Sequence, residues 1–239
     1  MSPSLAQRLS PLLQPLALRM RVEPDSGAPL LSRWLEPALL GEALGRYARN
    51  WPQADPRAVA SQWHQESSAL ILPPLLLARL LYAEPVSLEL GQLRMTVDEQ
   101  GAPGELHVPA PGVVAAGEGS GWGLLEALQV QLLAPFVSRF AAHTGLAPRV
   151  LWGNVALCVD WVLEVAQNVV PTRALGEARA HFRDGRQGGG GHALCSALRR
   201  DASGITRRVC CLRERLGFDR CAVCPLASRQ TLHNMPIQP

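Results

Sequence analysis

The sequence predicts an α+β fold that is predominantly helical. Apolar residues recur at helical spacing over most of residues 36–185, and one stretch, 86–109, alternates apolar and polar residues instead. The last fifty residues hold most of the cysteines in short pieces without clear periodicity. With 239 residues, of which 47% are hydrophobic, the chain is long enough to bury a sizeable core.

The first half of the chain predicts short helical pieces. Residues 36–51 carry apolar side chains at helical spacing. The next helix has a clear start signal, with Asp55 as the N-cap and Pro56 at the first helical position. Pro73 and Pro74 are expected to end this helix and to start another that runs to Tyr82.

Residues 86–109 predict a small antiparallel β meander. Alternate apolar residues fall into two sets, with "QGAPG" as a turn signal before the last strand: Val86, Leu88 and Leu90, then Leu93, Met95 and Val97.

Helical periodicity returns in the second half. The stretch 121–145 is expected to end at Gly145, a good C-cap. The helix that begins near Pro148 is apolar on most sides, which predicts a central buried helix. A further helix is expected to start at Pro171.

The glycine run 188–191 predicts a hinge between two parts of the chain. It lacks a preceding strand and a following Lys-Ser/Thr, so it does not fit a phosphate-binding loop. We therefore expect a helix-rich body over residues 1–187, which includes the meander, and a C-terminal module over residues 188–239.

Charge is distributed unevenly between these parts. All 23 basic residues are arginine. Residues 1–172 carry 11 arginines against 15 acids, whereas residues 173–239 carry 12 arginines against 5 acids. The basic excess therefore lies with the cysteines. The arginine-rich part lacks interleaved aromatic residues, which argues against nucleic-acid binding.

No stretch shows the roughly 18–20 uninterrupted apolar residues of a membrane span, and the first residues do not resemble a signal peptide. We therefore expect a cytoplasmic protein. Stable disulfides are disfavoured in that compartment, and clustered cysteines there are more often metal ligands or redox groups.

Four of the six cysteines form the pattern Cys-Cys-x9-Cys-x2-Cys over residues 210–224. The Cys-x2-Cys spacing lets two thiolates of one turn reach the same metal, as in zinc and iron–sulfur sites. The adjacent pair points to opposite sides of an extended chain, so both can reach one site only if the backbone turns there. A binuclear cluster suits this geometry better than a single ion, although zinc, a redox dithiol and unrelated core cysteines remain open.

The segment "RRVCCLRERLGFDRCAVCPL", residues 207–226, resembles the C-terminal cluster segment of the FhuF-type siderophore-iron reductases. "ASQWHQESSALILPPLLLARLL" is similar to the Ser-x-Trp helix of that family, and "RVLWGNVA" is similar to its Trp-Gly-Asn segment. The three segments occur in the expected order, and the spacing between the cysteine pairs is one residue shorter than usual.

The resemblance implies a 2Fe–2S cluster in the C-terminal module and a siderophore-binding body. Its cluster and metal ligands would be Cys210, Cys211, Cys221 and Cys224. Trp152 and Asn154 of the "WGN" segment, with Arg208 and Arg213 beside the cysteines, are candidates for substrate binding; helix packing and charge balance are the alternatives. No catalytic residue beyond the cluster is expected, because electron transfer needs no acid, base or nucleophile.

The implied function is the one-electron reduction of a ferric siderophore, which releases Fe(II) in the cytoplasm. No dinucleotide fingerprint is present, so electrons are expected from a separate ferredoxin or flavoprotein reductase. The sequence leaves open a transient contact with an inner-membrane transporter. The alternatives are a structural zinc module that uses the same four cysteines, and a siderophore-binding iron chaperone without reductase activity.

Three other residues are expected to have packing roles. Cys158 lies in an apolar helical run and predicts a core position. Cys195 has no counterpart in the cluster motif. His64 lies on an amphipathic helix and is expected to be a partly exposed packing histidine.

Overall fold

The structure, a computed structural model, describes residues 19–22, 27–83, 86–109, 120–169, 172–184, 193–202 and 204–226. Pro171 and the glycine run 188–191 lie outside the described residues. The hinge at that run, and the division of the chain there, therefore stay predictions.

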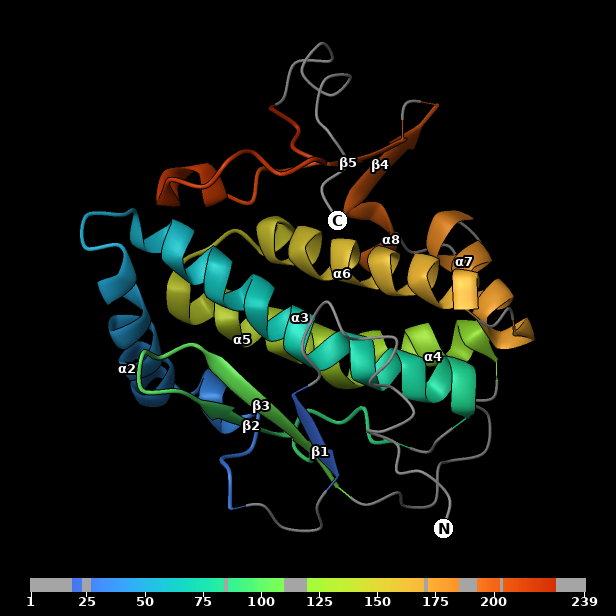
Figure 1. The fold of residues 1–239 in the computed structure, drawn as a ribbon, viewed down its shortest axis with the longest axis horizontal. Coiled ribbons are helices and arrows are strands. Elements are labelled where there is room, and N and C mark those ends of the chain that lie inside the picture. Colours follow the sequence, from blue (N-terminus) through green and yellow to red (C-terminus); the bar gives the residue numbers. More distant parts are fainter. Residues whose placement is uncertain are drawn as a thin grey trace.

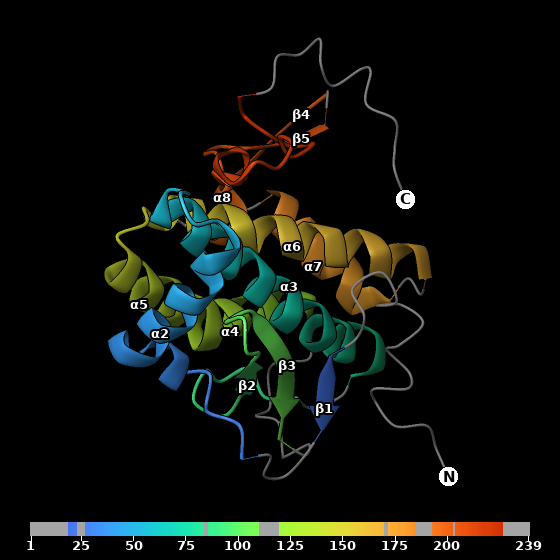
Figure 2. The ribbon, with the colours of Figure 1, turned by 60° about the vertical axis from the view of Figure 1, so that its left-hand side comes forward.

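The described elements are stacked in layers (Figure 1). A three-stranded sheet lies on one side of the helices, and a two-stranded hairpin that leads into the cysteines lies on the other. Figure 2 shows the same order from another direction. Helix α3 (Pro56–Tyr82) packs along helix α6 (Pro148–Val169), and it also contacts the sheet and the helical turn between the cysteine pairs. α3 therefore links the two sides of the molecule.

The expected helices in the first half are present. α2 (Pro37–Tyr47) lies between two short 3-10 turns, Arg33–Leu35 and Ala48–Asn50. α3 begins as predicted, because the carboxylate of Asp55 accepts a hydrogen bond of 2.9 Å from the backbone N–H of Arg57, and Pro56 takes the first helical position.

The predicted break at Pro73 and Pro74 is wrong. α3 runs through both prolines, is 27 residues long and ends at Tyr82. The next residue, Ala83, adopts a left-handed conformation with φ of 50°. Each proline inside a helix costs about 3 kcal/mol. Both prolines are buried, and Leu75, Leu76 and Leu77 directly after them are fully buried. Burial of this apolar stretch on all sides holds the helix together despite the missing backbone bonds.

The predicted meander is partly wrong. β2 (Arg94–Val97) and β3 (Pro103–Val108) form the expected antiparallel hairpin, and Gly101 in its turn has φ of +86°. Residues 86–90 are not a strand, although Val86, Leu88 and Leu90 are buried. The third strand is instead β1 (Met20–Val22), which pairs with β3 in parallel. The alternation at 86–90 reflects burial of one side of an extended segment rather than strand pairing.

The helical run after residue 120 is continuous but not uniform. α4 (Gly121–Leu128) passes through a π-helical turn at Gln129–Leu133 into α5 (Ala134–Thr144). Gly145 ends α5 with φ of +67°, as expected. Gly121 allows α4 to cross α7 (Arg173–Asp184) closely, because a Cβ at this position would lie 1.7 Å from the carbonyl oxygen of Ala174.

α6 is the central helix that the sequence predicted. It packs against α3, α5 and α7. Within the described part of the chain, its residues Pro148–Asn168 are the one helical stretch long and apolar enough to cross a membrane. Since 61% of that stretch is buried inside the molecule, its placement is that of a core helix.

Candidate metal centre

The four cysteines lie in residues 204–226, which we call the cysteine segment. A short helix, α8 (Ala193–Ser196), leads into the hairpin of β4 (Leu198–Asp201) and β5 (Gly204–Arg207). The first cysteine pair follows β5, a 3-10 turn (Arg213–Leu216) comes next, and the second pair closes the segment. The backbone N–H of Arg207 donates to the carbonyl of Val223 at 2.9 Å, which brings the two cysteine pairs together.

The backbone turns directly after the adjacent cysteines, as their sequence requires. Leu212 adopts φ of +67°, a conformation that is unusual for a bulky residue. Its backbone N–H donates to the sulfur of Cys210 at 3.3 Å, and the N–H of Arg213 donates to the sulfur of Cys211. Such hydrogen bonds to ligand sulfurs are one means by which proteins adjust the potential of iron–sulfur clusters.

The sulfurs of the two halves of the motif approach one another. Those of Cys211 and Cys221, the first pair, lie 3.9 Å apart, and Cys210 interacts electrostatically with both Cys211 and Cys224. Two thiolates on one tetrahedral metal lie about 3.8 Å apart when each metal–sulfur distance is about 2.3 Å. The first pair therefore has the separation that shared ligation of one metal requires.

Four cysteine thiols are the donor set of a binuclear cluster as well as of a zinc site. A structural zinc site needs four ligands around one point. Within the described ranges, no group of three or more His, Cys, Asp or Glu side chains is gathered closely enough to hold one metal ion. In a 2Fe–2S cluster each iron takes only two cysteines. The approach of Cys211 to Cys221 matches that requirement for one iron.

The thiols affect one another electrostatically. The hydrogen bond with Cys221 is the main cause that lowers the pKa of Cys211 to about 5, and the N–H of Arg213 and the cations of Arg207 and Arg213 add to it. The pKa of Cys221 is raised by the same hydrogen bond and by burial. Burial raises the pKa of Cys210. Cys211 is therefore the thiol that most readily becomes a thiolate ligand.

The site has a buried side and an accessible edge. Cys211 and Cys224 are 3% and 4% exposed, whereas Cys210 and Cys221 are half-buried. All four are free thiols. An electron could therefore enter or leave along the edge formed by Cys210 and Cys221.

The cysteine segment is attached to the helices by polar and aromatic contacts. The hydroxyl of Ser61 on α3 donates to the carbonyl of Cys211 at 2.8 Å. Arg215 forms an ion pair with Asp55, the N-cap of α3. The ring of Phe218 packs edge-on against Trp51, with centroids 5.9 Å apart.

Asn154, a predicted substrate-binding residue, lies inside the molecule. It is 1% exposed, and its amide nitrogen donates to the carbonyl of Ser61 at 3.1 Å. Its amide oxygen accepts a hydrogen bond of 2.7 Å from Arg207. In this structure Asn154 joins α3 to Arg207 of the cysteine segment, and its side chain is not accessible to a substrate.

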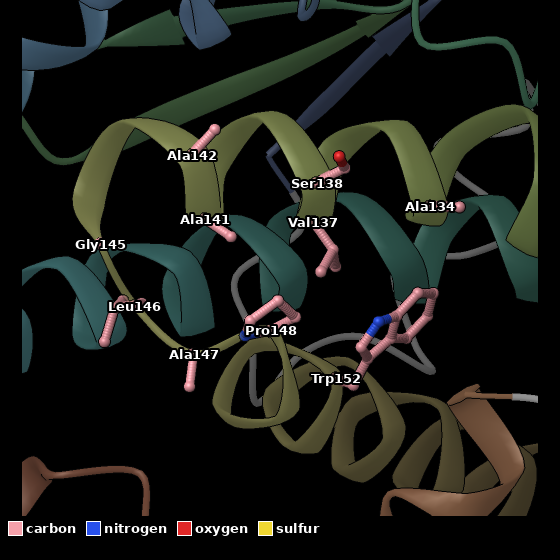
Figure 3. A pocket seen from close by; sticks show the side chains of 10 residues that line it. All are labelled: Ala134, Val137, Ser138, Ala141, Ala142, Gly145, Leu146, Ala147, Pro148 and Trp152. Carbon is pink, nitrogen blue, oxygen red and sulfur yellow. The ribbon is translucent and has the colours of Figure 1, made fainter.

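Trp152, on the same helix, points in another direction. Figure 3 shows its indole beside a shallow groove of about 680 Å³ between α5 and α6. The groove is lined mostly by small apolar residues: Ala134, Val137, Ser138, Ala141, Ala142, Gly145, Leu146, Ala147 and Pro148. Substrate binding by Trp152 stays a prediction.

The two predicted arginines lie beside the cysteines. Arg208 is exposed, and Arg213 is half-buried with its guanidinium 5.2 Å from the ring centroid of Phe218. A second hollow, of about 560 Å³, adjoins the turn between the cysteine pairs. Its lining comprises Asn50, Trp51, Pro52, Gln53, Ala54, Arg215 and Leu216.

The remaining candidates lie in the core. Cys158 packs against it, and burial raises the pKa of its thiol to about 12. Cys195 is half-buried, and its thiol donates to the carbonyl of His181 at 3.8 Å. His64 was expected to be partly exposed, but it is fully buried between Phe136 and Phe140 because α5 covers this face of α3.

Sequence reasoning missed Ser61, Gln65 and Arg207, which join the helices to the cysteine segment. Gln65 accepts a hydrogen bond of 3.4 Å from Arg207, which is itself 1% exposed. Long sequence separation conceals these contacts. The available signal was the presence of isolated polar residues on helix faces that are otherwise apolar.

Comparison with known proteins supplies a family. The model of the family described as "Ferric iron reductase FhuF-like transporter" matches residues 61–183, slightly more than half of the chain. The match runs from α3 to α7 and ends before the cysteine segment. A search of curated proteins found no match.

Proposed function

The chain belongs to the FhuF-like ferric iron reductase family, and on this premise we propose that it reduces a ferric siderophore by one electron in the cytoplasm. The resident group would be a 2Fe–2S cluster. The observation that carries the proposal is that the two cysteine pairs are brought together, with the sulfurs of Cys211 and Cys221 3.9 Å apart, on a segment attached to the matched region of the family through Ser61 and Asn154.

The ligands follow from the pairs. Cys211 and Cys221 would hold one iron, and Cys210 and Cys224 the other. When bound, the cluster supplies a one-electron couple. The protein would hold it on the turn at Leu212, with the N–H groups of Leu212 and Arg213 directed at two of the sulfurs.

One electron is what the substrate needs. A siderophore holds Fe(III) through hard oxygen donors, and Fe(II) binds those donors much less tightly. Reduction therefore turns a locked complex into one that gives up its iron. A separate ferredoxin or flavoprotein reductase would supply the electron, and the cytoplasm keeps unligated thiols reduced.

The hollow beside the cysteine pairs is the site we assign to the ferric siderophore. Arg215 and Leu216 in its wall belong to the turn between the two pairs, so a molecule bound there lies next to the ligands. Trp51 supplies an aromatic face. Arg215, whose side chain is 58% exposed, supplies a guanidinium whose charge is partly balanced by Asp55 and which still has N–H donors for an anionic complex. Arg208 and Arg213 add positive charge nearby.

The reductase proposal has a direct test. The purified protein is reduced stoichiometrically, the excess reductant is removed, and hydroxamate, catecholate and carboxylate ferric siderophores are added separately under anaerobic conditions. Reoxidation of the visible spectrum, with one Fe(II) trapped by a chelator for each electron lost, is the expected result with at least one class. If every class binds but none reoxidises the protein, the chain is an iron chaperone and the reductase proposal fails.

The assigned hollow is tested in the same assay. Arg215→Gln is expected to slow reoxidation threefold or more at low siderophore concentration, because the anionic complex loses the guanidinium and meets the carboxylate of Asp55 without its cation. Arg139→Gln, at an exposed arginine on α5, is the matched control and should leave the rate unchanged. Equal rates for the two variants would place the substrate elsewhere, with the groove beside Trp152 as the next candidate.

A further inference from the structure

Arg207 is buried in an unusual way for an arginine. It is 1% exposed and is among the largest fully buried side chains of the described residues. It ends β5, three residues before Cys210, and its backbone N–H holds the turn of the second cysteine pair through Val223. A guanidinium stays charged at all physiological pH values, so this is a permanent buried cation.

The groups that contact Arg207 are neutral. Its Nη1 donates to the amide oxygen of Asn154 at 2.7 Å, and its Nη2 donates to the amide oxygen of Gln65 at 3.4 Å. Among the described residues, its Nε has no hydrogen-bond partner, and no carboxylate forms an ion pair with Arg207. His64 nearby stays uncharged, since burial and the cation of Arg207 lower its pKa to about 3. Burial of a cation without a counter-charge is strongly unfavourable.

The cysteines are where a counter-charge can arise. Arg207 is bonded into both halves of the cysteine motif. Its backbone N–H donates to the carbonyl of Val223, next to Cys224, and its guanidinium binds Asn154, which contacts Ser61, the donor to the carbonyl of Cys211. Its charge also acts on Cys211 and Cys221. Thiolates that ligate metal are deprotonated, so a loaded site presents negative charge at that position. Arg213 and Arg220 also act on the cysteines, but they are half-buried and exposed, where water and salt screen them.

We infer that Arg207 is the fixed counter-cation of the cysteine site, and that its charge determines how readily the loaded site accepts an electron. Reduction adds one negative charge beside a cation that cannot move away or lose its proton. In surroundings of low dielectric constant this favours the reduced state more than an exposed arginine could. This inference rests on the proposed function, because it requires a redox group on the four cysteines.

The Ser-x-Trp segment on α3 and the Trp-Gly-Asn segment on α6 hold the guanidinium of Arg207 in place. The guanidinium lies against the backbone of α6 at Gly153, where an added Cβ would be in van der Waals contact with Nη1 of Arg207 at 3.4 Å. Asn154 binds Arg207 with its oxygen and Ser61 with its nitrogen. Ser61 in turn donates to the carbonyl of Cys211. Asn154, Ser61 and Gln65 are therefore positioning residues for Arg207 and for the ligand loop.

The test is the reduction potential, measured by spectroelectrochemical titration of the full chain, together with its iron and sulfide content. Arg207→Gln is expected to shift the equilibrium at least tenfold toward the oxidised form, which is a decrease of 59 mV for a one-electron couple. Arg207→Lys keeps the charge and should recover most of that shift. Arg199→Gln, at an exposed arginine on β4 of the same hairpin, should change the equilibrium less than twofold.

A second variant separates charge from structure. Asn154→Asp keeps the size of the side chain and the oxygen that accepts from Arg207, and its carboxylate offsets the charge of the guanidinium. It also loses the amide donor to Ser61, so iron and sulfide content are measured before the potential. We expect full cluster content and a shift toward the oxidised form like that of Arg207→Gln. A merely structural role for Arg207 predicts that Asn154→Asp leaves the potential unchanged, and that result would overturn the inference. The Asn154→Asp measurement tests the inference even if Arg207→Gln does not fold.

The presence of the cluster and the role of Arg207 can be refuted separately. A wild-type protein without iron and sulfide refutes the proposed function itself. A wild-type protein that carries the cluster, with a potential that neither Arg207→Gln nor Asn154→Asp changes by more than twofold, refutes only the role of Arg207.

Discussion

The helices α2 to α7 and the cysteine segment are held by different kinds of interaction. The helices share one apolar core, in which side chains such as Trp63, Phe140 and Phe182 are fully buried. Within residues 204–226, Leu216 is the single buried member of that core. The other buried side chains of this segment are Arg207, Cys211 and Cys224. The segment is attached to the helices mainly through hydrogen bonds, one ion pair and one aromatic contact.

Because of this difference, substitutions in the two regions should affect different properties of the protein. Apolar burial lets the helices fold without any bound group. The cysteine segment buries charge and thiols, which are favourable only when paired or ligated. Changes in the helical core should therefore alter the free energy of unfolding, whereas changes in the segment should alter cluster content and redox behaviour.

The largest expected effect is loss of the cluster. Cys221→Ser removes one ligand and is expected to abolish nearly all bound iron and sulfide. The unfolding free energy of the apoprotein, measured by urea denaturation, should stay within about 1 kcal/mol of the wild-type apoprotein, because Cys221 is half-buried and outside the core. Cys195→Ser is the control and should keep the cluster. An apoprotein that unfolds when Cys221 is replaced would contradict the separation.

A loss of stability with the cluster retained is expected when Gly121 is replaced. An added methyl group in Gly121→Ala would clash with the carbonyl of Ala174 and separate α4 from α7. We expect a loss of about 1–3 kcal/mol in unfolding free energy, with normal iron content in the folded fraction. Gly176→Ala on α7 meets no heavy atom within 4 Å and should instead stabilise the protein by about 0.4–1 kcal/mol. A variant Gly121→Ala as stable as wild type would show that this crossing tolerates a wider separation.

Acid should destabilise the helices through His64. Burial lowers its pKa from 6.5 to about 3, so below pH 6.5 the unfolded chain binds a proton that the folded chain does not. The stability due to neutral His64 is complete above pH 6.5 and is lost as the pH falls toward 3, at up to about 1.4 kcal/mol per pH unit. His64→Phe should remove this slope in urea unfolding of the apoprotein between pH 7 and 5. If the unfolding free energies of the variant and the wild type fall with pH at the same slope, another group causes the acid sensitivity.

The smallest effect is expected where the two regions meet at Asp55. Asp55→Asn keeps the N-cap of α3 but removes the ion pair with Arg215, which is partly exposed, so it should cost less than about 1 kcal/mol and less again in high salt. Asp55→Ala removes the cap as well and should cost about 1 kcal/mol more. If Asp55→Asn costs as much as Asp55→Ala in urea unfolding, the N-cap adds nothing to the unfolding free energy, which contradicts this expectation; a cost of Asp55→Asn well above about 1 kcal/mol would show that the ion pair is stronger than its exposure implies.

Local signals predicted the ends of several helices. Asp55 and Pro56 at the start of α3 and Gly145 at the end of α5 act within one turn of the chain, so the sequence alone determines them. The errors arose where tertiary contacts decide. Pro73 and Pro74 stay helical because their surroundings are buried, and β1 pairs with a strand more than eighty residues away.

The candidate site shows the same division. The four cysteines and their spacing could be read directly, since all lie within fifteen residues. Arg207 could not be assigned, because its partners Asn154 and Gln65 are 53 and 142 residues away. The sequence showed an arginine-rich segment but not which arginine is buried. Only the packing of α3 and α6 separates that residue from the exposed ones.

The central claim is that the cysteine segment holds a 2Fe–2S cluster, and chemical analysis tests it most directly. Protein produced and purified without oxygen in iron-replete medium is assayed for iron, zinc and acid-labile sulfide, with a visible spectrum before and after reduction. The account predicts two irons and two sulfides per chain and a spectrum that bleaches after uptake of one electron. A colourless protein with one zinc per chain and no sulfide would contradict it.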